Sequence, residues 1–276
     1  MGTSTGYNMP AGGDWTPLKR EATRFVKEGE GGSNGQTQSP TTKPIAPEDL
    51  LRDYIRALGG AKKLSQGTGG GDSARSSGSS GKGGGGGKSG GRTGRAARNT
   101  GRSLGGFLSS VGSVGLTEAL RDVGLSHLIG QSAAEVSLGL LDTLAAPAST
   151  LDEHAARLAL AKVNDEMLGD AETYGDVEAA LANVLDDQGL THIIASFFGE
   201  YLYQLFCRDF YEGWMKKVGA SSAGRALKNV KDCIASALKS KLVNRDITKL
   251  DWRGREGLRI TQSVMRDTLE IFEVTG

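Results

Sequence analysis

Residues 191–218 read THIIASFFGEYLYQLFCRDFYEGWMKKV and hold eight of the sixteen aromatic side chains of the protein. Large apolar residues recur at every fourth position: Ile194, Phe198, Leu202, Phe206, Phe210, Trp214 and Val218. A second row widens the same face: Ile193, Phe197, Tyr201 and Leu205. A helix with so wide an apolar face is surrounded by other elements, and each large side chain contributes about 1.5–3 kcal/mol when it is fully buried. We therefore predict that this helix is the centre of an all-α helical bundle, and that its aromatic stripe is core rather than a cofactor site.

Further helices are expected on both sides of this stretch. Their apolar rows lie within residues 136–144, 158–168, 177–185, 227–238 and 258–272. Ser132–Glu135 and Thr150–Glu153 have the capping-box pattern that starts a helix. Nearer the N-terminus, Thr16 followed by Pro17 predicts the start of a short helix. Residues 47–58 predict a second one.

Between these two groups lies a glycine-rich tract. From residue 67 to 94, 14 of 28 residues are glycine, and most of the others are polar or basic. Such a segment buries too little apolar area to offset its backbone entropy, so we expect it to be disordered. We expect an extended N-terminal arm at residues 1–15, short helices at 16–60, a disordered Gly/Ser/Arg-rich basic linker at 61–103 and a helical domain at 104–276. Residues 104–116 fit either a close-packed helix or a loop.

The tract and its flanks hold seven basic residues and no acidic one between Arg75 and Arg102: Arg75, Lys82, Lys88, Arg92, Arg95, Arg98 and Arg102. One interpretation is a nucleic-acid-binding segment, in which loose Lys/Arg contacts neutralise phosphates. The other is a flexible linker kept in solution by its charge. No aromatic residue is interleaved for base stacking, which favours the linker.

Charge is also uneven in the helical part. Most of the charged residues between positions 151 and 190 are acidic, whereas most of those between positions 216 and 249 are basic. The two regions are either a self-complementary solvated surface or docking patches for partner proteins. The sequence favours neither.

Several classes of function are disfavoured. The net charge of +1 gives no general attraction to nucleic acid or membranes, and the most apolar stretch is interrupted by charged residues. The chain has no signal-peptide pattern, and its two cysteines suit a reducing cytoplasm. His127, His154 and His192 lack the spacing of metal ligands, and no phosphate-binding or nucleophile motif is present. We expect a cytoplasmic protein that is not an enzyme, with no catalytic residue, no metal and no cofactor.

The first residues suggest a different chemistry. Initiator methionine is normally removed before a residue as small as Gly2. The tip would then carry a free glycine amine, followed by Thr3, Ser4, Thr5, Gly6 and Tyr7. An α-amine has a pKa near ~8 against ~10.4 for lysine, so a useful fraction is nucleophilic near neutral pH. The nearest lysine is Lys19. A frayed terminus without function is the alternative.

Short segments along the chain resemble the QatB family, a component of the bacterial Qat anti-phage defence system. They are the Met1-Gly2-Thr3-Ser4 start, Trp15-Thr16-Pro17-Leu18, Thr23-Arg24-Phe25-Val26-Lys27, Tyr54 to Gly60 and Thr150 to Arg157. The long glycine tract departs from the family pattern.

The resemblance implies three partners: a QueC-like enzyme (QatC), an ATPase (QatA) and a TatD-like nuclease (QatD). QueC-like enzymes activate a carboxy-deazaguanine with ATP, and related defence enzymes pass it to an N-terminal glycine. We therefore expect Gly2 to be the modification acceptor, residues 2–7 to enter the partner's pocket, and the helices to be a docking scaffold. The competing expectation is a nucleic-acid-binding subunit that uses the Gly/Arg-rich segment.

Overall fold

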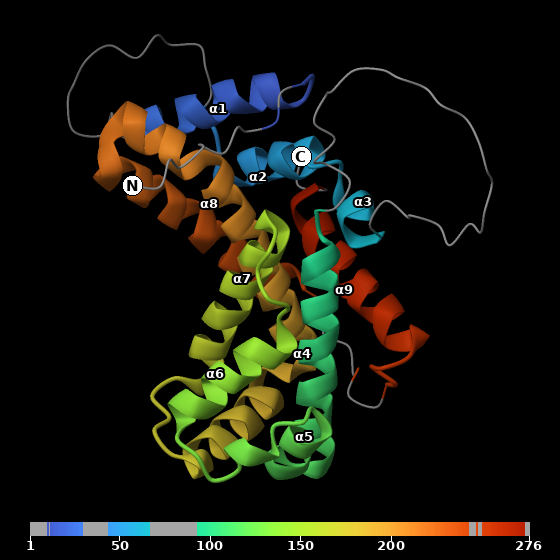
Figure 1. Ribbon diagram of the computed structural model, residues 1–276. Helices are drawn as coiled ribbons and strands as arrows, with labels where there is room; N and C mark the ends of the chain where they lie inside the picture. The colour runs from blue at the N-terminus through green and yellow to red at the C-terminus, as the bar shows by residue number, and fades with distance from the viewer. Residues whose placement is uncertain are drawn as a thin grey trace, which may run out of the picture.

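A computed structural model of the chain describes residues 10, 12–29, 44–66, 93–242, 247 and 250–273. Within these residues every regular element is a helix (Figure 1). The α-helices are α1 (Trp15–Glu28), α2 (Pro47–Ala57), α3 (Ala61–Gln66), α4 (Arg95–Val114), α5 (Leu116–Asp122), α6 (Ala133–Leu144), α7 (Leu151–Leu168), α8 (Tyr174–Lys241) and α9 (Arg255–Glu273), and a short 3₁₀ helix, η2, covers Ser126–Leu128. The predicted all-α class is confirmed.

Helix α8 is the centre of the molecule and is bent at two glycines. Gly189 and Gly219 have φ angles of 75° and 79°, which divide α8 into three helical segments. The middle segment is the aromatic stretch, and both of its predicted apolar rows are buried up to Trp214. Helices α1, α2, α4, α7 and α9 all pack against α8. The predicted central helix is confirmed.

Helices α1 and α2 pack against the C-terminal half of this aromatic segment, which includes Phe206 and Trp214. Tyr54 of α2 meets Trp15 edge to face at 6.0 Å and Phe206 at 5.1 Å between ring centroids. Phe25 of α1 lies 6.0 Å from Trp214. Aromatic pairs of this kind add about 0.5–1.5 kcal/mol beyond their buried area. The short helices near the N-terminus and the helical domain therefore share one core.

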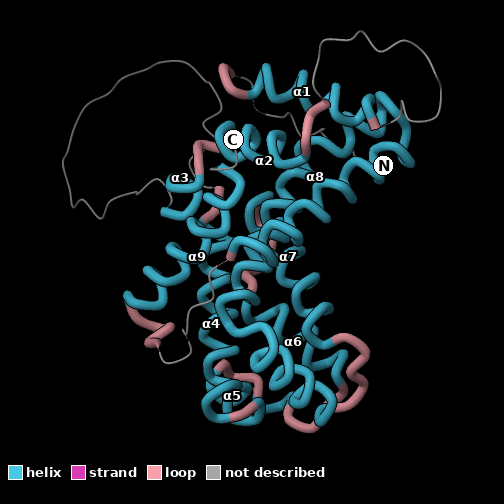
Figure 2. The backbone as a smooth tube through the Cα atoms, turned by 180° about the vertical axis from the view of Figure 1, so that it is seen from behind, coloured by secondary structure: helices cyan, strands magenta, loops and turns pink. Residues whose placement is uncertain are grey.

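Figures 1 and 2 show the resulting layout. Helices α1, α2 and α3 lie at one end of the molecule, and α5 and α6 lie at the other. Helices α4 and α7 run between the two ends, and α9 packs along α4 and reaches α2 and α3.

The observed helices correct the predicted boundaries of the disordered linker at residues 61–103. Residues 61–66 and 95–103 are helical rather than disordered, whereas residues 67–92 lie outside the described residues. The glycines of α4 serve close packing. A Cβ on Gly101 would lie 2.9 Å from Phe198 Cζ, and one on Gly105 would lie 2.3 Å from Trp252 Cζ3. Of the two structures that fitted residues 104–116, the close-packed helix is the one observed.

The predicted helix starts are mostly confirmed. Both capping boxes form, at Ser132–Glu135 for α6 and at Thr150–Glu153 for α7. The predicted start of α1 at Thr16 was wrong, because Asp14 is the N-cap. Thr16 is already inside the helix, since its backbone N–H donates to the Gly12 carbonyl at 3.3 Å. In the described part of the chain, no helix has the continuous apolar length that a membrane span requires.

Candidate functional site

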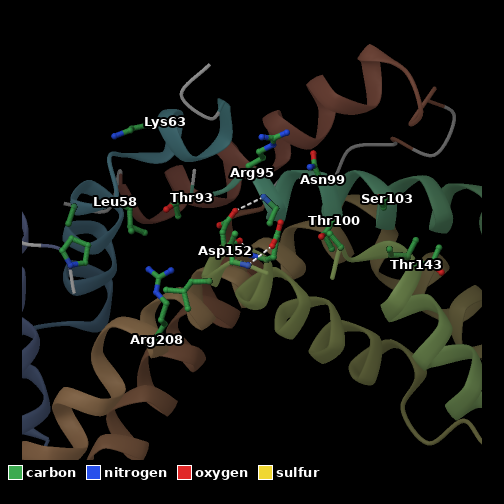
Figure 3. A pocket seen from close by; sticks show the side chains of 18 of the residues that line it. Leu58, Lys63, Thr93, Arg95, Asn99, Thr100, Ser103, Thr143, Asp152 and Arg208 are labelled. Atoms are coloured by element: carbon green, nitrogen blue, oxygen red, sulfur yellow. Dashed lines mark hydrogen bonds between the residues drawn. The ribbon is translucent and has the colours of Figure 1, made fainter. Parts of the chain in front are cut away.

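A cleft of about 1050 Å³ lies between α2 and α3 on one side and α4, α6 and α7 on the other (Figure 3). One wall comes from the end of α2 and from α3. The other comes from the first turns of α4 and α7 and the end of α6, and Arg208 of α8 also lines the cleft. Pro10 and Trp15, at the base of the N-terminal arm, lie on its border.

Asp152 joins the two helix starts on one wall of the cleft. Its carboxylate accepts hydrogen bonds from the backbone N–H of Gly94 at 2.9 Å and of Ala96 at 2.8 Å. It also accepts from the hydroxyl of Tyr201, and this hydroxyl accepts from Gly94 N–H at 2.9 Å. Burial, together with the adjacent carboxylate, raises the pKa of Tyr201 well above its ordinary value, so the phenol keeps the proton that it donates. A residue of the first turn of α7 thus caps α4.

The second carboxylate on this wall is also engaged. Glu153 accepts from the backbone N–H and hydroxyl of Ser149 and from the backbone N–H of Thr150, and these hydrogen bonds lower its pKa. Both acidic side chains of the cleft therefore stabilise helix starts. Two cations of the cleft are less engaged. Lys63 and Arg95 are exposed, and neither has a carboxylate within ion-pair distance among the described residues.

Arg208 belongs to a buried polar group beneath the cleft. Its guanidinium binds Asp209 through two hydrogen bonds of 2.7 and 3.0 Å, and the hydroxyl of Tyr54 donates to Asp209 at 2.7 Å. The Asp209 side chain is fully buried. Its charge is stabilised by this pairing, because an isolated buried carboxylate is very costly.

Sequence segments that lie far apart in the chain meet at this cleft. Trp15, Leu58 and the residues from Thr150 to Glu153 all line it. These residues belong to three of the segments that resemble the QatB family. A comparison with protein families agrees: the model of the family described as Qat anti-phage system associated protein QatB matches residues 85–272.

The chain belongs to the QatB family. It is thus a component of the Qat anti-phage system. The match spans α4 to α9, except the last residue of α9, and so includes the cleft wall built from α4, α6, α7 and α8. The arm and α1 to α3 lie outside the matched range. No curated protein and no solved structure matches the chain.

The residues predicted to enter the QatC pocket, Gly2, Thr3, Ser4, Thr5, Gly6 and Tyr7, lie outside the described residues. Pro10 is the first described residue of the arm, and its carbonyl accepts a hydrogen bond of 2.9 Å from Lys19 Nζ. The base of the arm is thereby fixed beside the cleft. Lys19, the lysine nearest to the N-terminus, is therefore the residue that binds the base of the arm.

The candidate nucleic-acid contacts do not form one surface in the described structure. Arg75, Lys82, Lys88 and Arg92 lie outside the described residues. Arg98 is buried and donates to the Leu64 carbonyl at 2.6 Å, so its role is structural. Arg102 donates to the Arg253 carbonyl at 3.2 Å, and Arg95 lies in the cleft. No group of three or more His, Cys, Asp or Glu side chains is placed to hold a metal ion in the described part of the chain.

Sequence reasoning missed Asp152, Tyr201 and Arg208. Asp152 lies inside a recognised capping box and therefore looked fully explained. Tyr201 looked like an ordinary core aromatic residue. The signal that was present is the Arg208–Asp209 pair within the aromatic row, since charged residues are rarely fully buried without partners.

Proposed function

We propose that this QatB-family chain acts as a protein substrate and scaffold that does no catalysis itself. Once Met1 is removed, Gly2 is presented to the QueC-like enzyme QatC for conjugation to a deazaguanine. The glycine nitrogen attacks the activated carboxyl carbon, an amide bond forms, and the activating group derived from ATP leaves as the amine loses a proton. The ATPase QatA and the TatD-like nuclease QatD are the further partners of the complex.

The observation that best supports this proposal is the fixed base of the arm. Pro10 lies on the border of the cleft and is held there by Lys19. Gly2 is eight residues before Pro10, so a fully extended arm reaches about 26–29 Å from that point. The helical body thus keeps the acceptor amine within a small volume and raises its effective concentration at the active site of a docked enzyme.

Engagement of Lys19 favours Gly2 as the acceptor. The Lys19 ammonium is occupied by the Pro10 carbonyl, and a lysine is mostly protonated near neutral pH whereas an α-amine is much less so. We expect the modification on the terminal amine and not on this side chain.

Mass spectrometry tests the proposal directly. The chain is co-expressed with QatC, and its N-terminal peptide is sequenced by fragmentation. We expect the mass of the deazaguanine adduct on Gly2, no adduct on Lys19, and loss of the adduct in a Gly2→Pro variant that still folds. An unmodified N-terminal peptide in the presence of active QatC would refute the proposal.

The alternative, a nucleic-acid-binding subunit, depends on the basic segment. Burial of Arg98 removes one of its seven candidate contacts. Replacing residues 67–92 by a short neutral loop tests whether this segment binds nucleic acid. Unchanged DNA retention at two salt concentrations would exclude the segment as the binding element.

A further inference from the structure

We infer that the cleft is the surface on which the QueC-like enzyme docks, and that it accepts an enzyme segment with an apolar side chain flanked by carboxylates. This inference rests on the proposed function, because the arm that the enzyme would modify starts at the edge of the cleft. The chemistry of the expected segment follows from the cleft walls.

Two cations of the cleft are available to carboxylates of a partner. Asp152 is bonded to two backbone N–H groups and a tyrosine hydroxyl, and Glu153 is bonded to the Ser149–Thr150 turn. Lys63 and Arg95 remain exposed on opposite walls (Figure 3). A partner carboxylate can therefore pair with these cations without displacing an existing ion pair. Complementary charge of this kind increases the association rate and selects the partner.

The cleft also exposes apolar side chains that the fold does not cover. Leu151, at the first position of α7, is 50% exposed, and Leu58 on the opposite wall is half-buried. An apolar side chain with an exposed cation on each wall is a suitable centre for an interface, since binding energy concentrates in a few desolvated residues.

The arm limits where the enzyme can bind. Its reach of about 26–29 Å from Pro10 means that the active site of a bound enzyme lies close to the cleft. Surfaces at the α5 end of the molecule are poorly placed for a short arm that begins at the α1 end (Figure 1). Docking over the cleft brings the enzyme to the base of the arm and leaves residues 2–9 free to enter its active site.

Two pairs of residues of the same type, each pair on one helix, test the inference with matched controls. Leu151 and Leu158 are exposed leucines of the same helix, but only Leu151 lines the cleft. Lys62 and Lys63 are adjacent exposed lysines of α3, and only Lys63 lines it. Glutamate is favourable in the first turn of a helix, so Leu151→Glu should not impair folding. We expect Leu151→Glu and Lys63→Glu each to weaken binding to purified QatC about tenfold, and Leu158→Glu and Lys62→Glu to change it less than about twofold.

A rate measurement separates this inference from the proposed function. A synthetic peptide of residues 2–10 is compared with the full chain as a QatC substrate. We expect the full chain to be modified much faster at equal concentration, and Leu151→Glu to lower its rate toward that of the peptide. If all four variants bind and react like the wild type, the docking inference is wrong although the proposed function stands. If the cleft variants lose binding while Gly2 is never modified, the docking surface stands and the proposed chemistry is wrong.

Photo-crosslinking identifies the occupant of the cleft. A photoreactive residue at position 151 should crosslink to QatC in the complex. Crosslinks only to residues 1–9 of the same chain, or to DNA, would overturn the inference.

Discussion

Asp152 connects two helices through one side chain. It accepts hydrogen bonds at the start of α4 and from the buried Tyr201 hydroxyl while it belongs to the first turn of α7. Replacing it with asparagine turns one acceptor atom into a donor that faces other donors. We predict that Asp152→Asn lowers the free energy of unfolding by about 1–2 kcal/mol, as measured by urea denaturation.

A surface aspartate supplies the control for this prediction. Asp165 is exposed and pairs with Lys162 on the same helix. Because exposed ion pairs contribute little, Asp165→Asn should change the stability by less than about 0.5–1 kcal/mol. Equal effects of the two substitutions would show that Asp152 does not join the helices energetically.

At the scale of one element, helix α4 shows why glycine has two meanings in a sequence. Gly105 allows the ring of Trp252 to approach the helix backbone. Alanine has a helix propensity better than glycine by about 1 kcal/mol, but the added methyl would overlap the ring, and overpacking costs about 1–3 kcal/mol. We predict that Gly105→Ala lowers the melting temperature.

Gly213 of α8 provides the opposite case. A Cβ added there meets no atom within 4 Å. Gly213→Ala should therefore stabilise the protein by up to about 1 kcal/mol, measured in the same thermal melts. If both alanines shift the melting temperature in the same direction, close packing does not explain the glycines of α4.

The same contrast explains which elements could be predicted. The middle segment of α8 was predictable because its apolar residues recur regularly over a long stretch. The capping boxes of α6 and α7 were predictable because each depends on only a few consecutive residues. The first residues of α4 were missed because the tract before them is dominated by glycine. No local pattern distinguishes Gly101, which packs against Phe198, from a glycine in a linker. The cleft was not predictable, since it depends on contacts such as Asp152 to Gly94 that join distant parts of the chain.

At the scale of the whole molecule, α3 and α4 are held together across the long tract between them. The Arg98 guanidinium donates to the Leu64 carbonyl at 2.6 Å, and a Cβ on Gly94 would lie 2.5 Å from the same oxygen. The two ends of the tract are therefore close in space. Because this contact joins the two ends directly, we expect the packing of the helices to depend little on the length of the tract.

Shortening the tract tests that independence. A variant in which about six Gly/Ser residues replace residues 67–92 closes a loop about fourfold shorter, and loop-closure entropy predicts a gain of about 1 kcal/mol. We expect it to fold, to melt slightly higher and to be modified at Gly2 as the wild type is. A loss of folding would mean that the tract contributes contacts to the core.

The contact between Leu64 and Gly94 also bears on how such a chain evolves. Runs of glycine codons lengthen and shorten readily during replication, and in most parts of a gene such changes are removed because they strain the protein. Here the flanking helices already touch, so selection on the body has little power over the number of repeats. Differences in the length of a glycine run can therefore accumulate at such a position at little cost.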